Sequence, residues 1–363
     1  MGHSAVDYLR SAVQSGASDL HLSVGAAPAV RIHGDIVQLE AEELTPDSSY
    51  KLVMSILNDT QRARLEENLE LDFAVKIDGV GRFRGNAHYN RGALEAVYRH
   101  INDTIPELND LGHEPIIDHI CNIKDGLVLV TGITGSGKSS TMAAMIQRIA
   151  ASRRNMIISV EDPIEFVFQH SASLVKQREI GQDTHSFANA LKSVLRQDPD
   201  VILISELRDL ETISAALTAA ETGHLVISTL HTIDAPKTLD RLIDAFPPNQ
   251  QSQVIAQLAN CLKAVISQRL LKKIGGGRVL AEEVMMMNRS IRNCLREEKF
   301  EQIEGLIEIG AQEGMFTIDA HLLTLVKRGH ITLEDAYREA RDETLLNSYV
   351  QEMKELEARS KKR

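Results

Sequence analysis

The chain has 363 residues, of which 43% are hydrophobic and 25% are charged, a balance typical of soluble globular proteins with room for about two domains. Its 40 basic and 51 acidic residues leave a net charge of −11, which argues against a nucleic-acid binder. It contains no apolar run of membrane-spanning length, and its start lacks a secretory signal. We therefore expect a cytoplasmic protein.

The three cysteines are Cys121, Cys261 and Cys294. They lie far apart and are odd in number, which argues against a disulfide framework and against a zinc site built on paired cysteines. We expect reduced, mostly buried thiols.

Residues 1–100 have the pattern of a small α+β domain. A helix is expected near Ala5–Gln14, and "SDLHLSV" then alternates apolar and polar residues with the period of a half-buried strand. "PAVRIHGDIVQL" continues the alternation around a turn, and "SYKLVMSIL" has helical spacing. "LDFAVKIDGVGRFRGNAHY" and "EAVYRHI" predict three more strands. We expect helices that cover one side of an antiparallel sheet.

Residues 101–112 contain a proline and several turn formers, which predicts a linker. Within 113–288, the apolar runs "GLVLVTG", "NMIISVED", "DVILISEL" and "HLVISTLH" each precede a helix-like stretch. This is the pattern of a parallel sheet buried on both faces, so the sequence predicts a doubly wound α/β nucleotide-binding core. Past Arg278 the chain reads as almost wholly helical, and 289–363 is predicted to be a helical C-terminal subdomain.

The stretch "VLVTGITGSGKSST" joins an apolar strand to a helix, and Gly132–Ser139 fits the phosphate-binding pattern G-x-x-x-x-G-K-[ST]. Its glycines let backbone N–H groups surround phosphates, and the following helix directs its positive end at them. Lys138 would neutralise phosphate charge and Ser139 would hold Mg²⁺. The residues predicted to contact the nucleotide are Thr134, Gly135, Ser136, Gly137, Lys138, Ser139 and Ser140.

Acidic residues follow two of the predicted strands, where parallel sheets bind ligands. Glu206 follows "DVILIS", and "SVEDPIEF" supplies Glu161, Asp162 and Glu165. Each could orient Mg²⁺ or polarise the attacking water, and each could instead be an ordinary helix cap or solvated acid. His224 and His231 bracket "HLVISTLH", with a phosphate-sensing or subunit-contact role as open as a structural one.

"GITGSGKSS", "SVEDPIEFVF" and "RQDPDVILISELRDLETISAALTAAETGHLVISTLHT", in this order and spacing, resemble the Walker A, Asp, atypical Walker B and His boxes of the secretion-superfamily ATPases. "SIRNCLREEK" is similar to the C-terminal motif of the branch that retracts type IV pili. The resemblance covers nearly the whole chain, since "SDLHLSVGAAPAVRIHGDI" is similar to the start of the family's PAS-like N-terminal domain.

The resemblance implies a RecA-like ATPase core in a homohexameric motor that hydrolyses ATP to retract pili in twitching motility. It also implies Mg²⁺ and ATP bound between the two domains, and an inner-membrane platform protein at the pilus base as the partner. Contact with the membrane would then be through partners only. A paralogous retraction ATPase is a further expected partner.

Several site residues are assigned by this resemblance. Lys138 corresponds to the Walker A lysine, and Glu206 to the Walker B glutamate, which also serves the metal. Glu165 corresponds to the Asp-box glutamate, and His224 and His231 to the His-box pair. In the N-terminal domain, Arg82, Arg84 and Arg99 correspond to arginines that reach over the nucleotide, although an exposed basic strand face would look the same.

The C-terminal motif also predicts an amphipathic helix. Ile291, Cys294 and Leu295 share one face and should pack on the core. Arg292, Arg296 and Lys299 would line another face as a basic stripe, which is either a solvated surface or the output surface of the motor.

Four alternatives remain. An accessory retraction paralogue fits the same motifs. The assembly ATPases of pili and type II secretion share the boxes but usually carry paired cysteines and an extra N-terminal region, and this sequence shows neither. A nucleic-acid translocase is disfavoured by the net charge and by an aromatic content of 4%. A scaffold that binds ATP without hydrolysis is disfavoured by the strand-end acids.

Overall fold

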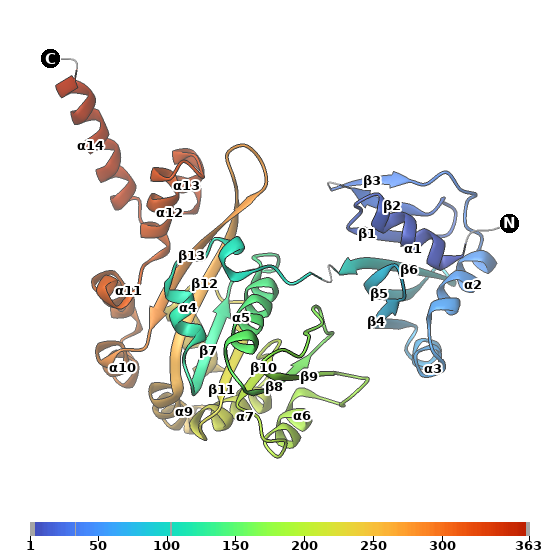
Figure 1. Cartoon of the computed structure of the whole chain (residues 1–363), viewed down its shortest axis with the longest axis horizontal. Coiled ribbons are helices and arrows are strands. Elements are labelled where there is room, and N and C mark those ends of the chain that lie inside the picture. The colour runs from blue at the N-terminus through green and yellow to red at the C-terminus, as the bar shows by residue number, and fades with distance from the viewer. Residues whose placement is uncertain (1–3, 33, 102–103, 361–363) are drawn as a thin grey trace. The chain divides into compact units, whose positions relative to one another are not determined.

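The structure of this chain is a computed structural model that describes residues 4–32, 34–101 and 104–360. The chain divides into two units (Figure 1). The first unit holds residues 1–104 together with Pro163–Val167, and the second holds Ile105–Asp162 and all residues from Phe168 onward.

The first unit is an α+β fold with one six-stranded antiparallel sheet, in the order β3-β2-β1-β6-β5-β4. Its elements are α1 (Ala5–Gln14), β1 (Asp19–Leu22), β2 (Ala29–Ile32), β3 (Asp35–Gln38), α2 (Pro46–Ile56), α3 (Asp59–Asn68), β4 (Glu70–Ile77), β5 (Gly81–Asn90) and β6 (Ala93–Ile101). Every helix and strand expected in this part of the sequence is confirmed.

Local sequence explains where these elements begin and which side they bury. Ser4 starts α1 because its side chain accepts a hydrogen bond from the backbone N–H of Asp7, while the Asp7 side chain returns one to Ser4. Ala5, Leu9 and Ala12 recur at helical spacing and are all buried. On β1 the period is two, so Leu20 and Leu22 enter the core of this unit and Asp19 lies on the opposite face.

The second unit is built on a seven-stranded sheet, in the order β13-β12-β7-β11-β10-β8-β9. All neighbouring pairs are parallel except β12 and β13. The strands are β7 (Gly126–Thr131), β8 (Met156–Glu161), β9 (Leu174–Glu179), β10 (Val201–Ile204), β11 (Leu225–Leu230), β12 (Leu262–Lys272) and β13 (Arg278–Met286). The central strands β7, β10 and β11 are buried along their whole length, as their continuous apolar runs predicted.

Helices connect these strands and extend the unit beyond the sheet. They are η1 (Leu108–Leu111), α4 (Ile116–Cys121), α5 (Lys138–Ser152), α6 (Phe187–Val194), α7 (Leu210–Glu221), α8 (Ala235–Asp244) and α9 (Pro248–Cys261). After β13 follow α10 (Arg289–Arg296), η2 (Phe300–Gln302), α11 (Ile303–Ile309), η3 (Ala311–Glu313), α12 (Ile318–Lys327), α13 (Leu333–Glu339) and α14 (Thr344–Ser360). The expected helical C-terminal part is therefore present from Arg289 onward.

One expectation is wrong: the chain does not turn helical directly after Arg278. Arg278–Met286 forms β13, an edge strand antiparallel to β12. Glu282 and Glu283 stand in the middle of its apolar run, which makes the segment look unlike a buried strand. Both side chains are fully buried because each has a basic partner, His113 for Glu282 and Arg341 for Glu283.

Two of the three cysteines are buried, as expected, and Cys294 is partly exposed. Burial raises the pKa of both Cys121 and Cys261 to about 12, so these thiols are unreactive at neutral pH. In the part of the chain that the structure describes, no helix has the length and apolar character needed to cross a membrane.

Candidate active site

The phosphate-binding pattern lies in the turn between β7 and α5. Helix α5 begins at Lys138, and the residue before it, Gly137, has a φ of +92° and supplies no side-chain cap. The first N–H groups of α5 therefore have no capping side chain, and they carry the positive end of the helix dipole. This turn has the backbone arrangement that binds anions in other nucleotide-binding proteins.

The turn is braced by β12, which lies beside β7. The Nε2 of Gln268 donates a 2.7 Å hydrogen bond to the carbonyl oxygen of Ser136, and Gln268 is almost fully buried. Gly132 has a φ of +144°, and a Cβ atom on it would lie 2.3 Å from the carbonyl oxygen of Gln268. Only glycine fits there. Sequence reasoning missed Gln268, because a glutamine within a strand has no local signature of this role.

Lys138 is the cation of this turn. Its Nζ donates hydrogen bonds to the carbonyl oxygens of Gly132 at 2.7 Å and Ile133 at 3.1 Å, so the ammonium group lies against the loop. The group is nine-tenths buried. A phosphate entering the loop would meet the Lys138 charge and the α5 N-terminus together.

The acid predicted to act in hydrolysis lies at the same edge of the sheet. Because β7, β11, β10 and β8 are parallel neighbours, their carboxyl ends share one edge. Glu206 follows β10, and its Oε2 accepts a 2.8 Å hydrogen bond from the Nε of Arg208. The Nε2 of His231, the first residue after β11, lies 3.2 Å from the Oε1 of Glu206.

Arg208 connects two of the strand ends. Besides its bond to Glu206, it lies 3.7 Å from a carboxylate oxygen of Asp162, which follows β8. The hydrogen bond to Glu206 raises the pKa of Arg208 above its ordinary value. Glu206 is therefore held between a permanent cation and an imidazole.

Glu161 and His224 have other surroundings. Glu161 ends β8 and is buried, and its Oε1 accepts hydrogen bonds from Ser159 at 2.6 Å and Gln177 at 2.9 Å. His224 precedes β11 and so lies at the opposite edge from His231. Its Nδ1 is 2.9 Å from the carbonyl oxygen of Ala219, near the end of α7. The structure thus brings His231, and not His224, to Glu206 within one chain.

The remaining predicted site residues belong to the first unit. Glu165 lies in the half-buried segment Pro163–Val167. Arg84 on β5 is paired directly with Arg99 on β6, and Arg99 is paired with Asp19 on β1. Directly opposed residues share a face of the sheet, so two arginines stand side by side with one acid. Arg82 lies two residues from Arg84 on the same face.

Asp19 is the counter-charge of Arg99. The Arg99 Nε donates a 2.8 Å hydrogen bond to the Oδ1 of Asp19, and a nitrogen of Arg31 lies 4.0 Å from its Oδ2. Burial opposes ionisation of Asp19, but hydrogen bonds from Ser18 and Arg99 lower its pKa below the usual range. Arg84 has no acid paired beside it in the register of β5 with β4 and β6.

A magnesium ion would find oxygen donors at the strand edge of the second unit. Mg²⁺ binds proteins through one or two oxygen ligands and keeps its waters, and Ser139 and Glu206 supply a hydroxyl and a carboxylate. Among the described residues, no group of three or more His, Cys, Asp or Glu side chains could hold a metal ion by itself. The donor set fits Mg²⁺ carried in with a nucleotide better than a resident transition metal.

Comparison with known proteins identifies the family. A family model for the type II/IV secretion system protein matches residues 4–299 of this chain. The chain belongs to that family. The resemblance to secretion-superfamily ATPases in the sequence is confirmed.

Relatives within the type II/IV secretion system family include pilus motors. The chain is 47% identical to the type IV pilus retraction ATPase PilT of Pseudomonas aeruginosa over 336 residues, which are 92% of this chain and 97% of that protein. It is 39% identical to the type IV pilus ATPase PilU of the same organism over 333 residues, 92% of this chain and 87% of PilU.

A solved structure supports the same conclusion on the fold. The crystal structure of the pilus retraction motor PilT with bound ADP matches this chain with a TM-score of 0.88 at 48% identity, and it covers 94% of this chain and 98% of that one. The Legionella pneumophila ATPase DotB matches with a TM-score of 0.77 at 26% identity, over 93% and 96% of the two chains. The predicted α/β fold, an N-terminal domain followed by a RecA-like ATPase core, is confirmed.

Proposed function

We propose that this chain is an ATP-hydrolysing motor that disassembles and retracts type IV pili. The observation that carries the proposal is the common sheet edge, where the phosphate-binding turn after β7 and the Glu206–His231 contact after β10 and β11 lie on neighbouring parallel strands. The similarity to PilT, which extends over nearly the whole of both chains, gives this ATPase its cellular task.

Nucleotide binding falls to the turn and the start of α5. The backbone N–H groups of the turn and helix start surround the phosphates, and Lys138 moves its ammonium charge from the loop carbonyls to the phosphate oxygens. Ser139 and Glu206 would hold Mg²⁺, which supplies positive charge to the phosphates when bound. The turn residues assigned to binding are Thr134, Gly135, Ser136, Gly137, Lys138, Ser139 and Ser140.

Glu206 orients the attacking water and accepts its proton as the water oxygen bonds to the γ-phosphorus and the bond to ADP breaks. Arg208 and His231 fix the direction of its two oxygens, so little reorganisation is needed at the moment of reaction. His231 would also respond to the phosphate, a role that we take from the family resemblance.

The other predicted residues supply charge around the same reaction. Arg84 and Arg99, with Arg82 beside them, stabilise phosphate charge during transfer. Glu165 shares the acid function. His224, at the opposite sheet edge, acts at a contact between subunits. These roles are our proposals from the family resemblance.

The motor works as a homohexamer at the inner-membrane face of the pilus base, where an inner-membrane platform protein receives its force. A paralogous retraction ATPase is a second partner. Retraction is favoured over an accessory PilU-like role because identity to PilT, 47%, exceeds identity to PilU, 39%. An assembly role in pili or type II secretion is the remaining alternative. Loss of the gene separates them, since excess surface pili indicate retraction and absent pili indicate assembly.

The experiment that tests the ATPase assignment is Glu206→Gln. Glutamine keeps the shape of the side chain but removes the charge, so we expect kcat to fall by about 10²-fold or more. The Kd for ADP should change by less than about threefold, because the turn and Lys138 are untouched. The matched control is Glu211→Gln, an exposed acid in the first turn of α7, which should keep normal turnover. Near-normal hydrolysis by Glu206→Gln would transfer the role to Glu165 or Glu161.

A further inference from the structure

The loop that carries His231 is short and leads directly into a helix. It consists of His231, Thr232, Ile233 and Asp234, between β11 and α8. Asp234 caps α8 by accepting a 2.7 Å hydrogen bond from the backbone N–H of Lys237. Any shift of this loop would move His231 relative to Glu206.

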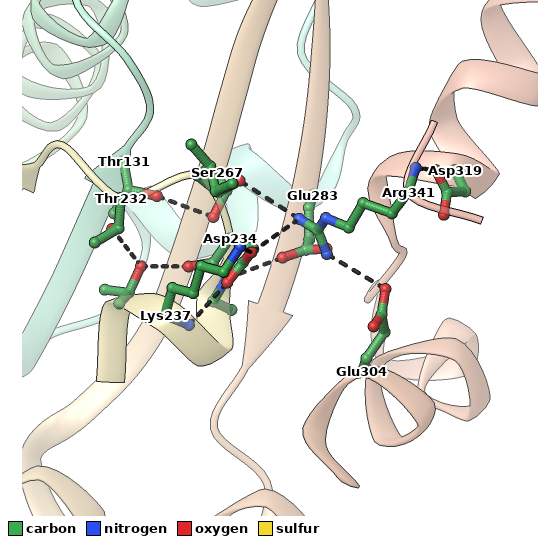
Figure 2. Close-up of polar contacts among 12 residues, drawn as sticks. Thr131, Thr232, Asp234, Lys237, Ser267, Glu283, Glu304, Asp319 and Arg341 are labelled. Carbon is green, nitrogen blue, oxygen red and sulfur yellow. Dashed lines mark hydrogen bonds and ion pairs between the residues drawn. The ribbon is translucent and has the colours of Figure 1, made fainter. Parts of the chain in front are cut away.

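Arg341, from the turn between α13 and α14, contacts this loop from the C-terminal side of the chain (Figure 2). Its Nη2 donates a 3.4 Å hydrogen bond to the carbonyl oxygen of Ile233 and lies 4.0 Å from a carboxylate oxygen of Asp234. Its Nη1 donates to Glu283 at 2.9 Å and lies 3.4 Å from Glu304. One guanidinium thus joins the loop, β13 and α11.

Glu283 completes the connection to α8. Its side chain is fully buried, and its Oε1 accepts a 3.0 Å hydrogen bond from the backbone N–H of Ala235, the first residue of α8. Burial raises the pKa of Glu283, and the charge of Arg341 opposes that shift. Removing Arg341 would leave a buried carboxylate at the helix start without its cation.

Arg341 is itself held in place by its backbone. The buried Asp319, on α12, accepts hydrogen bonds from the backbone N–H of Arg341 at 2.9 Å and of Asp342 at 3.0 Å. Nearby, Arg269 on β12 binds the carbonyl oxygen and the carboxylate of Glu339. The guanidinium therefore projects from a fixed point on the C-terminal helices.

The shortest contact of Arg341 is the 2.9 Å hydrogen bond to Glu283, and its contacts with the loop, to Ile233 and Asp234, are longer. Its Nε is buried and has no hydrogen-bond partner among the described residues, while both terminal nitrogens reach the loop or its neighbours. Buried polar atoms without a partner are uncommon, and here the terminal nitrogens make the contacts that hold the guanidinium. Lysine could not make these divergent contacts with one nitrogen.

We propose that Arg341 is a positioning residue for ATP hydrolysis, which holds the His231–Asp234 loop so that His231 meets Glu206. This proposal rests on the proposed function, because it assumes that Glu206 acts in hydrolysis. The C-terminal helices thereby take part in turnover, although they contribute no group to the reacting atoms.

The test measures kcat per bound nucleotide in the full chain, with active sites counted by ADP titration. Arg341→Gln should lower kcat about 10-fold to 10²-fold while KM and the Kd for ADP stay within about threefold, since misplacing a group by about 1 Å has effects of that size. Arg341→Lys should recover only part of the rate. The control is Arg338→Gln on α13, three residues earlier, whose guanidinium pairs only with Glu334 and Asp335 in the described part of the chain.

A purely structural role is separated by a double-mutant cycle with His231→Ala, measured in single turnover so that slow variants remain readable. If Arg341 acts through His231, Arg341→Gln should cause no further loss of rate in the His231→Ala background. Independent, multiplicative losses would overturn the proposal, as would an Arg341→Gln variant with normal kcat. If Arg341→Gln does not fold, the same cycle with Arg341→Lys decides. Normal activity of Glu206→Gln would instead refute the assignment of hydrolysis to Glu206, on which this proposal rests, independently of the cycle.

Discussion

At the scale of single residues, the buried imidazole of His321 makes stability depend on pH. Its Nδ1 accepts a 2.9 Å hydrogen bond from the backbone N–H of Glu282, and burial lowers its pKa, helped by Arg328 and opposed by the carboxylates of Glu282 and Glu114. The unfolded chain takes up a proton at this histidine near pH 6.5, whereas the folded chain resists it, so the stabilisation present above pH 6.5 is lost as the pH falls. We expect the free energy of unfolding of His321→Asn, which keeps an acceptor for the same N–H, to fall less between pH 6.5 and 5.5 than that of the unchanged protein. The difference should be at most about 1 kcal/mol, the limit reached when only the unfolded chain takes up the proton. Denaturant titration at the two pH values measures this, and exposed His119→Asn is the control. Equal slopes in the unchanged protein and the His321 variant would contradict it.

At the scale of elements, α10 is bound to the end of α9. The Arg292 Nε donates a 2.6 Å hydrogen bond to the carbonyl oxygen of Ala259, and Arg296 reaches the side chain of Asn260 at 3.2 Å. Only these two residues of the expected basic stripe are helical, because α10 ends at Arg296 and Lys299 beyond it pairs with Glu297.

We expect the double variant Arg292→Ala with Arg296→Ala to keep most ATPase activity and to abolish pilus retraction. Its Tm should fall by a few degrees, because hydrogen bonds from charged groups contribute about 1.5–3 kcal/mol to the free energy of unfolding. Twitching assays and ATPase rates test this, with Lys299→Ala as the control. Normal twitching in the double variant would show that the two arginines only stabilise the contact between α10 and the end of α9.

At the scale of the whole molecule, hydrolysis should depend on both units. Arg84 stands opposite Arg99 on the first unit's sheet and lies beside no acid in the strand register, so its removal should not destabilise that unit. We expect Arg84→Ala to lower kcat about 10-fold or more, as losses of arginines that stabilise phosphate charge do, with Tm unchanged. Arg99→Ala is the less clean variant, because it would deprive buried Asp19 of its closest cation. The control is Arg64→Ala on α3, an exposed arginine of the same unit. Full activity of Arg84→Ala would show that the first unit's arginines take no part in turnover.

The fold was predictable where physical signals are local. The strands β7, β8, β10 and β11 are continuous apolar runs, and such runs need only a buried sheet to be recognised. The hairpin of β12 and β13 was not expected, since Glu282 and Glu283 are adjacent charges whose partners, His113 and Arg341, come from distant parts of the chain. Local sequence cannot predict that a carboxylate will be paired with a basic residue that is distant along the chain.

The candidate site likewise contains residues that local sequence predicts and residues that only distant contacts reveal. The candidate phosphate-binding turn is one contiguous motif, so its glycines, Lys138 and Ser139 could be predicted from spacing alone. Glu206 was predictable as an acid after a buried strand. The bracing by Gln268 and the hold of Arg341 on the His231 loop were not predictable, because each depends on a contact across the sheet that the sequence order conceals.

The position of β12 beside β7 has a consequence for a chain emerging from the ribosome. Gln268 is made 132 residues after Ser136, the residue that it holds in the phosphate-binding turn. Until β12 has been synthesised, β7 is an edge strand whose unpaired backbone groups and mostly apolar side chains can pair with other chains. A nascent chain at that stage carries the complete nucleotide-binding motif but lacks the strand that braces it. We expect such a chain to depend on protection from aggregation, and not yet to bind ATP. Competence to bind nucleotide therefore arrives late in translation, together with the C-terminal third of the protein.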